Sequence, residues 1–218
     1  MTVTDSAARR PSTPTHTRRW VLGAAAVVVL AAMAFDTKVV VIGSEHDVRE
    51  QKFQPDAFGE EQFPIIQKSV ETRAVDAVEV AKAIAADKKA AGEKYGVAAS
   101  IGPIIPVSFT GVVGERKSNY NMVDIDGMPD GVKVRIQTGP ALNGTDLRDA
   151  TGDITFGQFT NQIEYQNAGS AINNQVKKTV LADIDPEKLT GKTVSVVGVF
   201  RLVSTKNWIV TPVRLDVK

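Results

Sequence analysis

The sequence predicts an α+β protein: an N-terminal membrane-anchor helix, a helical region, and a sheet of five strands with one long helix between the third and fourth. Three observations support this. Residues Val21 to Phe35 are almost all apolar. Between residues 64 and 96, apolar residues recur at helical spacing. From Ile104 onward they alternate with polar residues, which is the period of strands.

The composition excludes several classes of function for the part that follows the anchor. The chain has 26 basic and 25 acidic residues, and the first 35 residues hold four arginines and one Asp, which leaves 22 − 24 = −2. Such a balance gives no global field that would attract nucleic acid. The chain has no cysteine, and its two histidines are His16 and His46, so thiol chemistry, a Ser-His-Asp triad and a multi-histidine zinc site are excluded there. We therefore expect no cofactor, metal or nucleic-acid partner, and favour a protein that is not an enzyme.

The N-terminus predicts export. Residues 1–19 form a basic leader, residues 20–35 a signal-anchor helix and residues 36–63 a connector. Ala32-Met33-Ala34 has the small-x-small pattern at which a signal peptidase cleaves, so removal after Ala34 is one reading. Retention is the reading we favour, although residues 20–35 would span only about 24 Å of a ~30 Å bilayer core. The protein is then a single-pass protein of the cell membrane, with its arginines inside and its C-terminal domain on the extracytoplasmic side.

The helical region is predicted over residues 64–96. Pro64 suits the first position of a helix, and Asp76 followed by Glu79 has the spacing of a capping box. Val80, Ala81, Ile84 and Ala85 then share one face, and Tyr95-Gly96 ends the helix. A face of this kind most often packs on its own domain; a partner-binding helix is the alternative.

Residues 97–218 are predicted to form one domain, a five-stranded OB-like β-barrel. The order of its elements is similar to that of the OB barrel, in which a helix lies between strands three and four. An open antiparallel sheet with a helix on one face is the competing reading. From Ala98 to the end there are 13 basic and 12 acidic residues, too even a balance for a nucleic-acid groove. The predicted elements are strands at 104–109, 120–125, 132–137, 194–203 and 208–217, a helix over 155–180 that begins with Thr155-Phe-Gly-Gln158, and a turn at Thr205-Lys206-Asn207.

Two polar segments invite a functional reading. Asp124-Ile-Asp126-Gly-Met-Pro-Asp130-Gly131 lacks the spacing of an EF-hand, and its residues suit a hairpin turn, which we favour over a metal site. The other is GPALNGTDLRDATGDITFGQFTNQIEY, Gly139 to Tyr165. It is either a polar turn in which Arg148 pairs with Asp146, Asp149 or Glu164, or a ligand cradle. The candidate residues for binding a ligand or a partner are Arg148, Asp149, Asn161, Gln162 and Glu164.

The same stretch carries a resemblance. GPALNGTDLRDA and FGQFTNQIEY resemble the signature of a bacterial family of predicted periplasmic lipoproteins, domain-of-unknown-function family 2291. FQPDAF from Phe53, AVDAVEVAKAIAADKKAAGEKYG from Ala74, GKTVSVVGVF and TPVRLDV extend the match over nearly everything after the anchor. The residues that match the signature are Gly139, Pro140, Gly144, Thr145, Arg148, Asp149, Ala150, Phe156, Phe159, Asn161, Gln162, Ile163, Glu164 and Tyr165.

The resemblance implies an envelope protein whose genes lie beside those of sugar ABC transporters. A lipoprotein needs a lipobox cysteine, which this chain lacks, so the resemblance strengthens the expectation of a retained anchor helix. The function that follows is a non-enzymatic accessory or binding protein, with an ABC transporter component or a carbohydrate as its partner. The alternative is a carboxylate-dependent hydrolase of the glycosidase type, with Asp149 and Glu164 as the acid–base pair.

Overall fold

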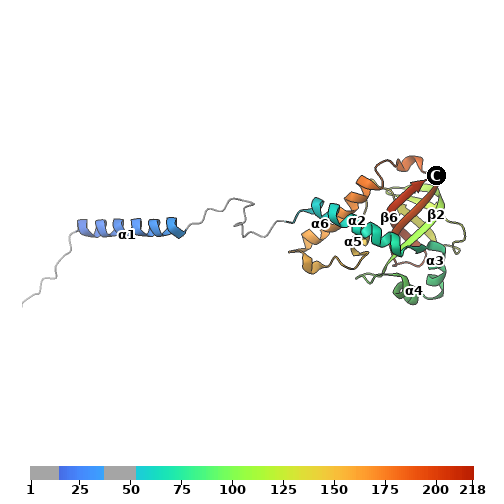
Figure 1. Ribbon diagram of the computed structural model, residues 1–218, viewed down its shortest axis with the longest axis horizontal. Helices are drawn as coiled ribbons and strands as arrows, with labels where there is room; N and C mark the ends of the chain where they lie inside the picture. The colour runs from blue at the N-terminus through green and yellow to red at the C-terminus, as the bar shows by residue number, and fades with distance from the viewer. Residues whose placement is uncertain (1–14, 37–52) are drawn as a thin grey trace, which may run out of the picture. The chain divides into compact units, whose positions relative to one another are not determined.

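The computed structural model describes residues 15–36 and 53–218, which Figure 1 draws in colour. The chain divides into one unit of residues 1–52 and a second of residues 53–218. Residues 1–14 of the predicted leader and 37–52 of the predicted connector lie outside the described residues.

Helix α1 (Thr15–Asp36) is longer than the apolar run that predicts it. It has 22 residues, which at about 1.5 Å per residue gives about 33 Å, the thickness of a bilayer core. Its segment Arg19–Asp36 is long and apolar enough to cross a membrane by length and composition, with a mean hydropathy of 1.7. The large apolar side chains of that segment are exposed.

Helix α2 (Pro55–Arg73) begins earlier than the Pro64 start that the sequence suggests. Pro55 takes the first helical position, where its missing N–H costs nothing, and Pro64 lies inside the helix. An interior proline frees a carbonyl one turn earlier, at Glu60. Glu60 and Pro64 are both exposed, so water can bond that carbonyl, while Phe63 and Ile66 on the other side are buried.

The second helical stretch is two helices. Asp76 caps α3 (Ala77–Ala86) as predicted, since its Oδ1 accepts from the backbone N of Val78 at 2.9 Å and of Glu79 at 3.1 Å. Asp87 then caps α4 (Lys88–Tyr95) in the same way, which is why the helix does not run through. Val80, Ala81 and Ile84 are buried as expected, whereas Ala85 is exposed.

The sheet has six strands, so the predicted count of five is wrong. The sixth is β1 (Val75–Asp76), which pairs in parallel with β2 at Val107 and Ser108 and is too short to show an alternating pattern. The order is β1-β2-β3-β4-β6-β5, and β2 also pairs with β5, so the five long strands form a closed ring of pairings. The long strands are β2 (Ile104–Lys117), β3 (Tyr120–Asp124), β4 (Lys133–Gln137), β5 (Thr193–Arg201) and β6 (Asn207–Val217).

The ring closes because β2 changes partner along its length. Its first part, Ile104 to Val112, pairs with β5, and its last part, Val112 to Lys117, pairs with β3. β5 and β6 form the predicted antiparallel hairpin, while β4 and β6 run parallel. The β5–β6 register shifts at Val197/Gly198, where a Cβ on Gly198 would collide with the carbonyl oxygen of Thr211. Gly198 is therefore required by a bulge.

The helix between β4 and β5 begins later than predicted. Asn161, not Thr155, caps α6 (Gln162–Thr179), and Thr155 precedes only a short 3₁₀ turn, η1 (Phe156–Gln158). A one-turn helix, α5 (Asp146–Asp149), comes before it. α6 packs along α2, where a Cβ on Gly59 would lie 2.8 Å from the backbone of Ala171.

The core lies between the sheet and these helices. Phe200 and Trp208 stack at 4.1 Å between ring centroids in its middle, and both are fully buried. All of the clustered core residues fall between Phe63 and Leu215. Residues 53–218 thus have a hydrophobic core of their own, which is what an independently folding α+β domain requires.

Candidate functional site

Arg148 fastens α5 onto α6. Its side chain is 8% exposed, and its Nε and Nη2 both lie 2.8 Å from Oδ1 of Asp149. Its Nη1 donates to the backbone carbonyl of Tyr165 at 3.0 Å, and the guanidinium lies 3.5 Å from the centroid of the Tyr165 ring. The expectation that Arg148 pairs with a carboxylate is confirmed. Its partner is Asp149 and not Glu164.

Arg201, at the end of β5, extends this contact into a chain of ion pairs. Its Nη2 donates to Oδ2 of Asp149 at 2.8 Å and its Nε to Oδ1 of Asp146 at 2.9 Å. The order Asp146–Arg201–Asp149–Arg148 therefore alternates in charge, and we call these four residues the ion-pair chain. The hydroxyl of Thr145 adds a bond to Oδ2 of Asp149 at 2.9 Å. No side chain in the ion-pair chain is more than 15% exposed.

Burial and charge act against each other in the ion-pair chain. Burial raises the pKa of Asp146 above its usual value, and the nearby Asp149 adds to this, against the lowering effect of Arg201. Burial also acts to lower the pKa of Arg201, but its hydrogen bonds and charge contacts with Asp149 and Asp146 together raise it. Buried pairs of this kind add little net stability over apolar packing, but breaking one is costly. The ion-pair chain thus fixes α5, β5 and α6 in one geometry.

The remaining predicted site residues lie at the start of α6. Oδ1 of Asn161 accepts from the backbone N of Glu164 at 3.0 Å, and Oε2 of Glu164 accepts from the backbone N of Thr160 at 3.0 Å. These bonds are those of a capping box shifted by one residue. Gln162 is exposed. Asn161, Gln162 and Glu164 are not bonded to the ion-pair chain, so the structure does not bring the five candidates into one cluster.

A cleft opens beside the Arg148 end of the ion-pair chain. It encloses about 350 Å³, and Arg148, Asp149, Phe156 and Tyr165 line it together with residues 98–100. The Phe156 ring is 50% exposed and meets the Tyr165 ring edge-on at 5.7 Å. Both oxygens of Asp149 are already bonded, so the exposed aromatic ring is the main contact that this cleft offers.

A cavity of about 290 Å³ opens beside the other end, where Asp146 and Arg201 line it. We call it the polar cavity because seven of its ten lining residues have polar or charged side chains, although Val203 and Ile209 also line it. Gln137 holds one wall, since its side chain bonds both the N and the O of the Asn143 backbone at 2.8 and 3.0 Å. Other lining residues come from the start of β3, the start of β6 and the loop before β6. Within residues 53–218, no hydrogen-bond partner is found for the side-chain polar groups of three lining residues, Tyr120, Asn143 and Asn207, of which the two asparagines are exposed.

The hydrolase alternative would need two carboxylates free to face a substrate. Both oxygens of Asp149 bind arginines, and Glu164 caps a helix. This geometry does not present Asp149 and Glu164 as an acid–base pair. The Asp124–Gly131 segment, for its part, joins β3 to β4 as a hairpin turn, with Gly127 and Gly131 at positive φ. Across residues 15–36 and 53–218 there is no group of three or more His, Cys, Asp or Glu side chains that could hold a metal.

Sequence reasoning missed the residues that come from far along the chain. Arg201 lies 52 positions after Asp149, and its only local signal is a charged residue that ends the apolar strand VSVVGVFR. The sequence places Asn143 only within the polar segment Gly139 to Tyr165, and Asn207 only in the turn between the last two strands. Asn207, at the start of β6, reaches this site across the β5–β6 connection from Arg201, at the end of β5, and both line the polar cavity.

Comparison with known proteins agrees with the fold and the expected family. An OB-fold protein from Thermotoga maritima, known from its crystal structure, is similar to this chain with a TM-score of 0.62 and 18% identity, over 77% of this chain and 100% of the other. No curated protein matches the sequence. The family described as predicted periplasmic lipoprotein, domain-of-unknown-function family 2291, matches residues 24–216, from within α1 to the end of β6. This chain belongs to that family of predicted periplasmic lipoproteins.

Proposed function

We propose that this chain is a non-enzymatic, membrane-anchored binding protein of the extracytoplasmic space. The family description supports a periplasmic location, and α1 is long enough to serve as a single retained anchor. With Arg18 and Arg19 at its start, α1 would enter the membrane from the cytoplasmic side and leave residues 53–218 outside.

The observation that carries the binding function is the polar cavity beside Asp146 and Arg201. It presents a hydroxyl and two amides without protein partners, and one oxygen of Asp146, Oδ2, also has none among the described residues. Grouped donors and acceptors of this kind bind a ligand that is itself rich in hydroxyls. The ion-pair chain contains two positive and two negative side chains, so the cavity favours a neutral ligand. Its volume of about 290 Å³ suits a molecule of monosaccharide size.

The ion-pair chain serves this site by positioning. Arg201, at the end of β5, bonds the Asp146 carboxylate, and both Arg201 and Arg148 bond Asp149 at the end of α5. Gln137 fixes the backbone of Asn143. A site whose walls are fixed before the ligand arrives loses less conformational entropy on binding. Arg148 and Asp149, two of the residues singled out from the sequence, thus act on binding through Asp146.

The ligand class is tested by titrating residues 53–218 with a panel of neutral mono- and disaccharides in a calorimeter. Asn143→Ala and Asn207→Ala each remove a side-chain amide and keep the backbone bonds. Each should weaken the binding of the best sugar by about threefold to tenfold, the value of one hydrogen bond. Asn167→Ala, in the exposed face of α6 and away from the cavity, is the matched control and should leave the affinity unchanged. Binding that all three variants share, or no sugar that binds below about 1 mM, refutes the assignment.

The proposed partner is a component of a carbohydrate ABC transporter, which rests on the resemblance of the sequence motifs alone. Affinity capture of the full chain from membranes solubilised in mild detergent should co-purify a transporter subunit, and the yield should change when the sugar is added. Capture of the chain without any transporter component counts against this partner and leaves the sugar titration unaffected.

The anchor has its own test. The full chain should stay in the membrane fraction after a wash at high salt or high pH, because α1 crosses the bilayer. Recovery of a soluble mature form that begins at Phe35 would show cleavage after Ala34 and would contradict a retained anchor.

A further inference from the structure

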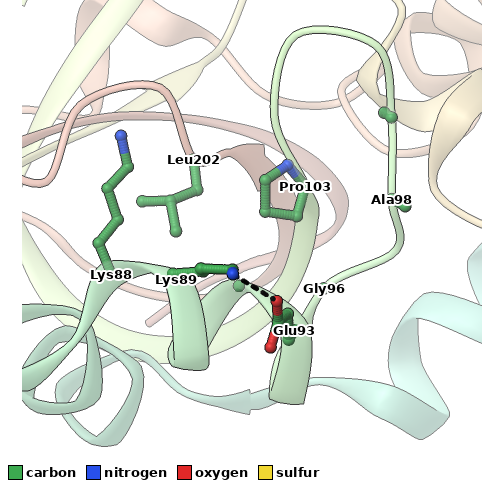
Figure 2. A pocket seen from close by; sticks show the side chains of 9 residues that line it. Lys88, Lys89, Glu93, Gly96, Ala98, Pro103 and Leu202 are labelled. Atoms are coloured by element: carbon green, nitrogen blue, oxygen red, sulfur yellow. Dashed lines mark ion pairs between the residues drawn. The ribbon is translucent and has the colours of Figure 1, made fainter.

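A second, apolar groove lies between α4, the loop of residues 97–103 and the end of β5, and its lining residues differ from those of the polar cavity. Figure 2 shows Leu202 and Pro103 on its walls, with Ala98 on the loop that borders it. It encloses about 600 Å³, within the roughly 300–1,000 Å³ of small-molecule sites. Apart from the charged ends of Lys88, Lys89 and Glu93, its lining is made of glycine, alanine, proline and leucine.

The groove is preformed by close packing. A Cβ on Gly92 would lie 2.9 Å from Pro103 and 3.7 Å from Leu202, so both side chains lie directly over the α4 backbone. Val97 and Ile104 bond each other through both backbone groups at 2.9 Å, which closes the loop between them. These bonds fix the two ends of the loop that borders the groove.

Lys88 and Lys89 lie at the mouth of the groove, and Lys89 makes only a weak ion pair. Lys88 donates from its Nζ to the carbonyl of Val203 at 2.7 Å. Lys89 lies 3.9 Å from Glu93, and the two side chains are 87% and 70% exposed, so this pair contributes almost nothing. Figure 2 shows this pair near Leu202 and Pro103. Lys89 can turn to an incoming anion at little cost.

The apolar surface continues beyond the groove. Ile101, two residues before Pro103, is 73% exposed, and Val203, directly after Leu202, is 56% exposed and also lines the polar cavity. An exposed apolar surface beside an apolar groove marks a binding site more often than chance. The rim carries two lysines against one carboxylate, that of Glu93, so its net positive charge favours an occupant with an acidic group at one end and an apolar remainder.

We propose that this groove binds a free single-chain anionic amphiphile, a fatty-acid carboxylate or a close analogue. The alkyl chain lies along the apolar lining formed by Ala98, Pro103 and Leu202, and the carboxylate meets Lys89 and Lys88 at the mouth. The residues that line the groove differ from those that line the polar cavity, although Leu202 lies between Arg201 and Val203 of that cavity, and fatty-acid binding does not depend on the sugar-binding function.

The test uses residues 53–218 and dodecanoate below its micelle concentration, with binding measured by calorimetry. The parent should bind one equivalent saturably, and hexanoate should bind at least tenfold more weakly because it buries less alkyl chain. Lys89→Glu, at an exposed position in the first turn of α4, should weaken dodecanoate at least tenfold without lowering the melting temperature. Lys82→Glu is the matched control: it makes the same charge change on the exposed face of α3, and should alter the affinity less than twofold.

Three results overturn the proposal. The first is no saturable binding of dodecanoate to the parent. The second is an equal loss in Lys82→Glu and Lys89→Glu, which would reflect net charge alone. The third is a result with vesicles of anionic phospholipid. If the parent does not bind free dodecanoate but co-sediments with these vesicles, and Lys89→Glu abolishes the co-sedimentation, the surface binds the membrane instead.

Discussion

Replacing Arg148 with alanine tests whether the ion-pair chain holds the domain together. The change removes both contacts with Oδ1 of Asp149, the bond to the Tyr165 carbonyl and the stacking on the Tyr165 ring. Removing one partner of a buried ion pair costs about 3–5 kcal/mol, mainly because the other charge is left unpaired. Asp149 is not left unpaired here, since its Oδ2 keeps Arg201. We therefore expect a loss at the low end, about 3 kcal/mol.

The loss is measured as the change in unfolding free energy of residues 53–218 in urea. It should also lower the melting temperature by about 6–12 °C, given about 2–4 °C per kcal/mol for a domain of this size. Arg214→Ala is the matched control. Arg214 pairs with Glu71 at 3.4 Å, its side chain is 53% exposed, and its removal should cost less than about 1 kcal/mol.

Arg148→Lys separates charge from shape. It keeps the positive charge but loses the fork that reaches Asp149 and Tyr165 together, so its stability should fall between those of the parent and Arg148→Ala. An Arg148→Ala protein that unfolds like the Arg214→Ala control would refute the reasoning, because it would show that the Arg148 side chain is solvated and adds nothing to the free energy of unfolding.

Three further changes test the account. Arg201→Ala should cost more than Arg148→Ala, because it leaves the carboxylates of Asp146 and Asp149 facing each other, and the loss should shrink in acid as they protonate. Burial raises the pKa of Asp146 above 3.8, so the folded state binds more protons between 3.8 and the raised pKa, and this carboxyl contributes less stability as pH rises through that window. The urea stability of Asp146→Asn, relative to the parent, should therefore increase with pH across the same window. Asn161→Ala removes the cap of α6 and should cost about 1 kcal/mol in urea; a loss of sugar affinity without that cost would instead assign Asn161 to the ligand.

How much of the fold could be predicted depended on how local the signal was. The strands at Ile104 and Trp208 show alternation over a few residues, and Asp76 is a cap that acts on the N–H groups directly after it. The start of α6 was misplaced because Thr155 and Asn161 both satisfy a capping pattern. Of the two, only the Asn161 side chain accepts a hydrogen bond from a backbone N–H of the following turn, so α6 begins after Asn161.

The candidate site was predictable only in part for the same reason. Arg148 and Asp149 are adjacent in sequence, so their pairing could be expected from arginine's geometry. Arg201 and Asn207 reach the site through strand pairing, and no spacing in the sequence encodes that β4 lies beside β6. Gly139 to Tyr165 thus holds one half of the site, and the end of β5 and the start of β6 hold the other half.

The central claim is that the polar cavity beside Asp146 and Arg201 binds a neutral, hydroxyl-rich ligand. A crystal structure of residues 53–218 grown with the tightest sugar of the titration panel tests it most directly. The account predicts a sugar in this cavity, with hydroxyls about 2.7–3.2 Å from the side chains of Asn143 and Asn207. A sugar bound only in the cleft beside Phe156, or a cavity that contains only solvent at a saturating sugar concentration, would contradict it.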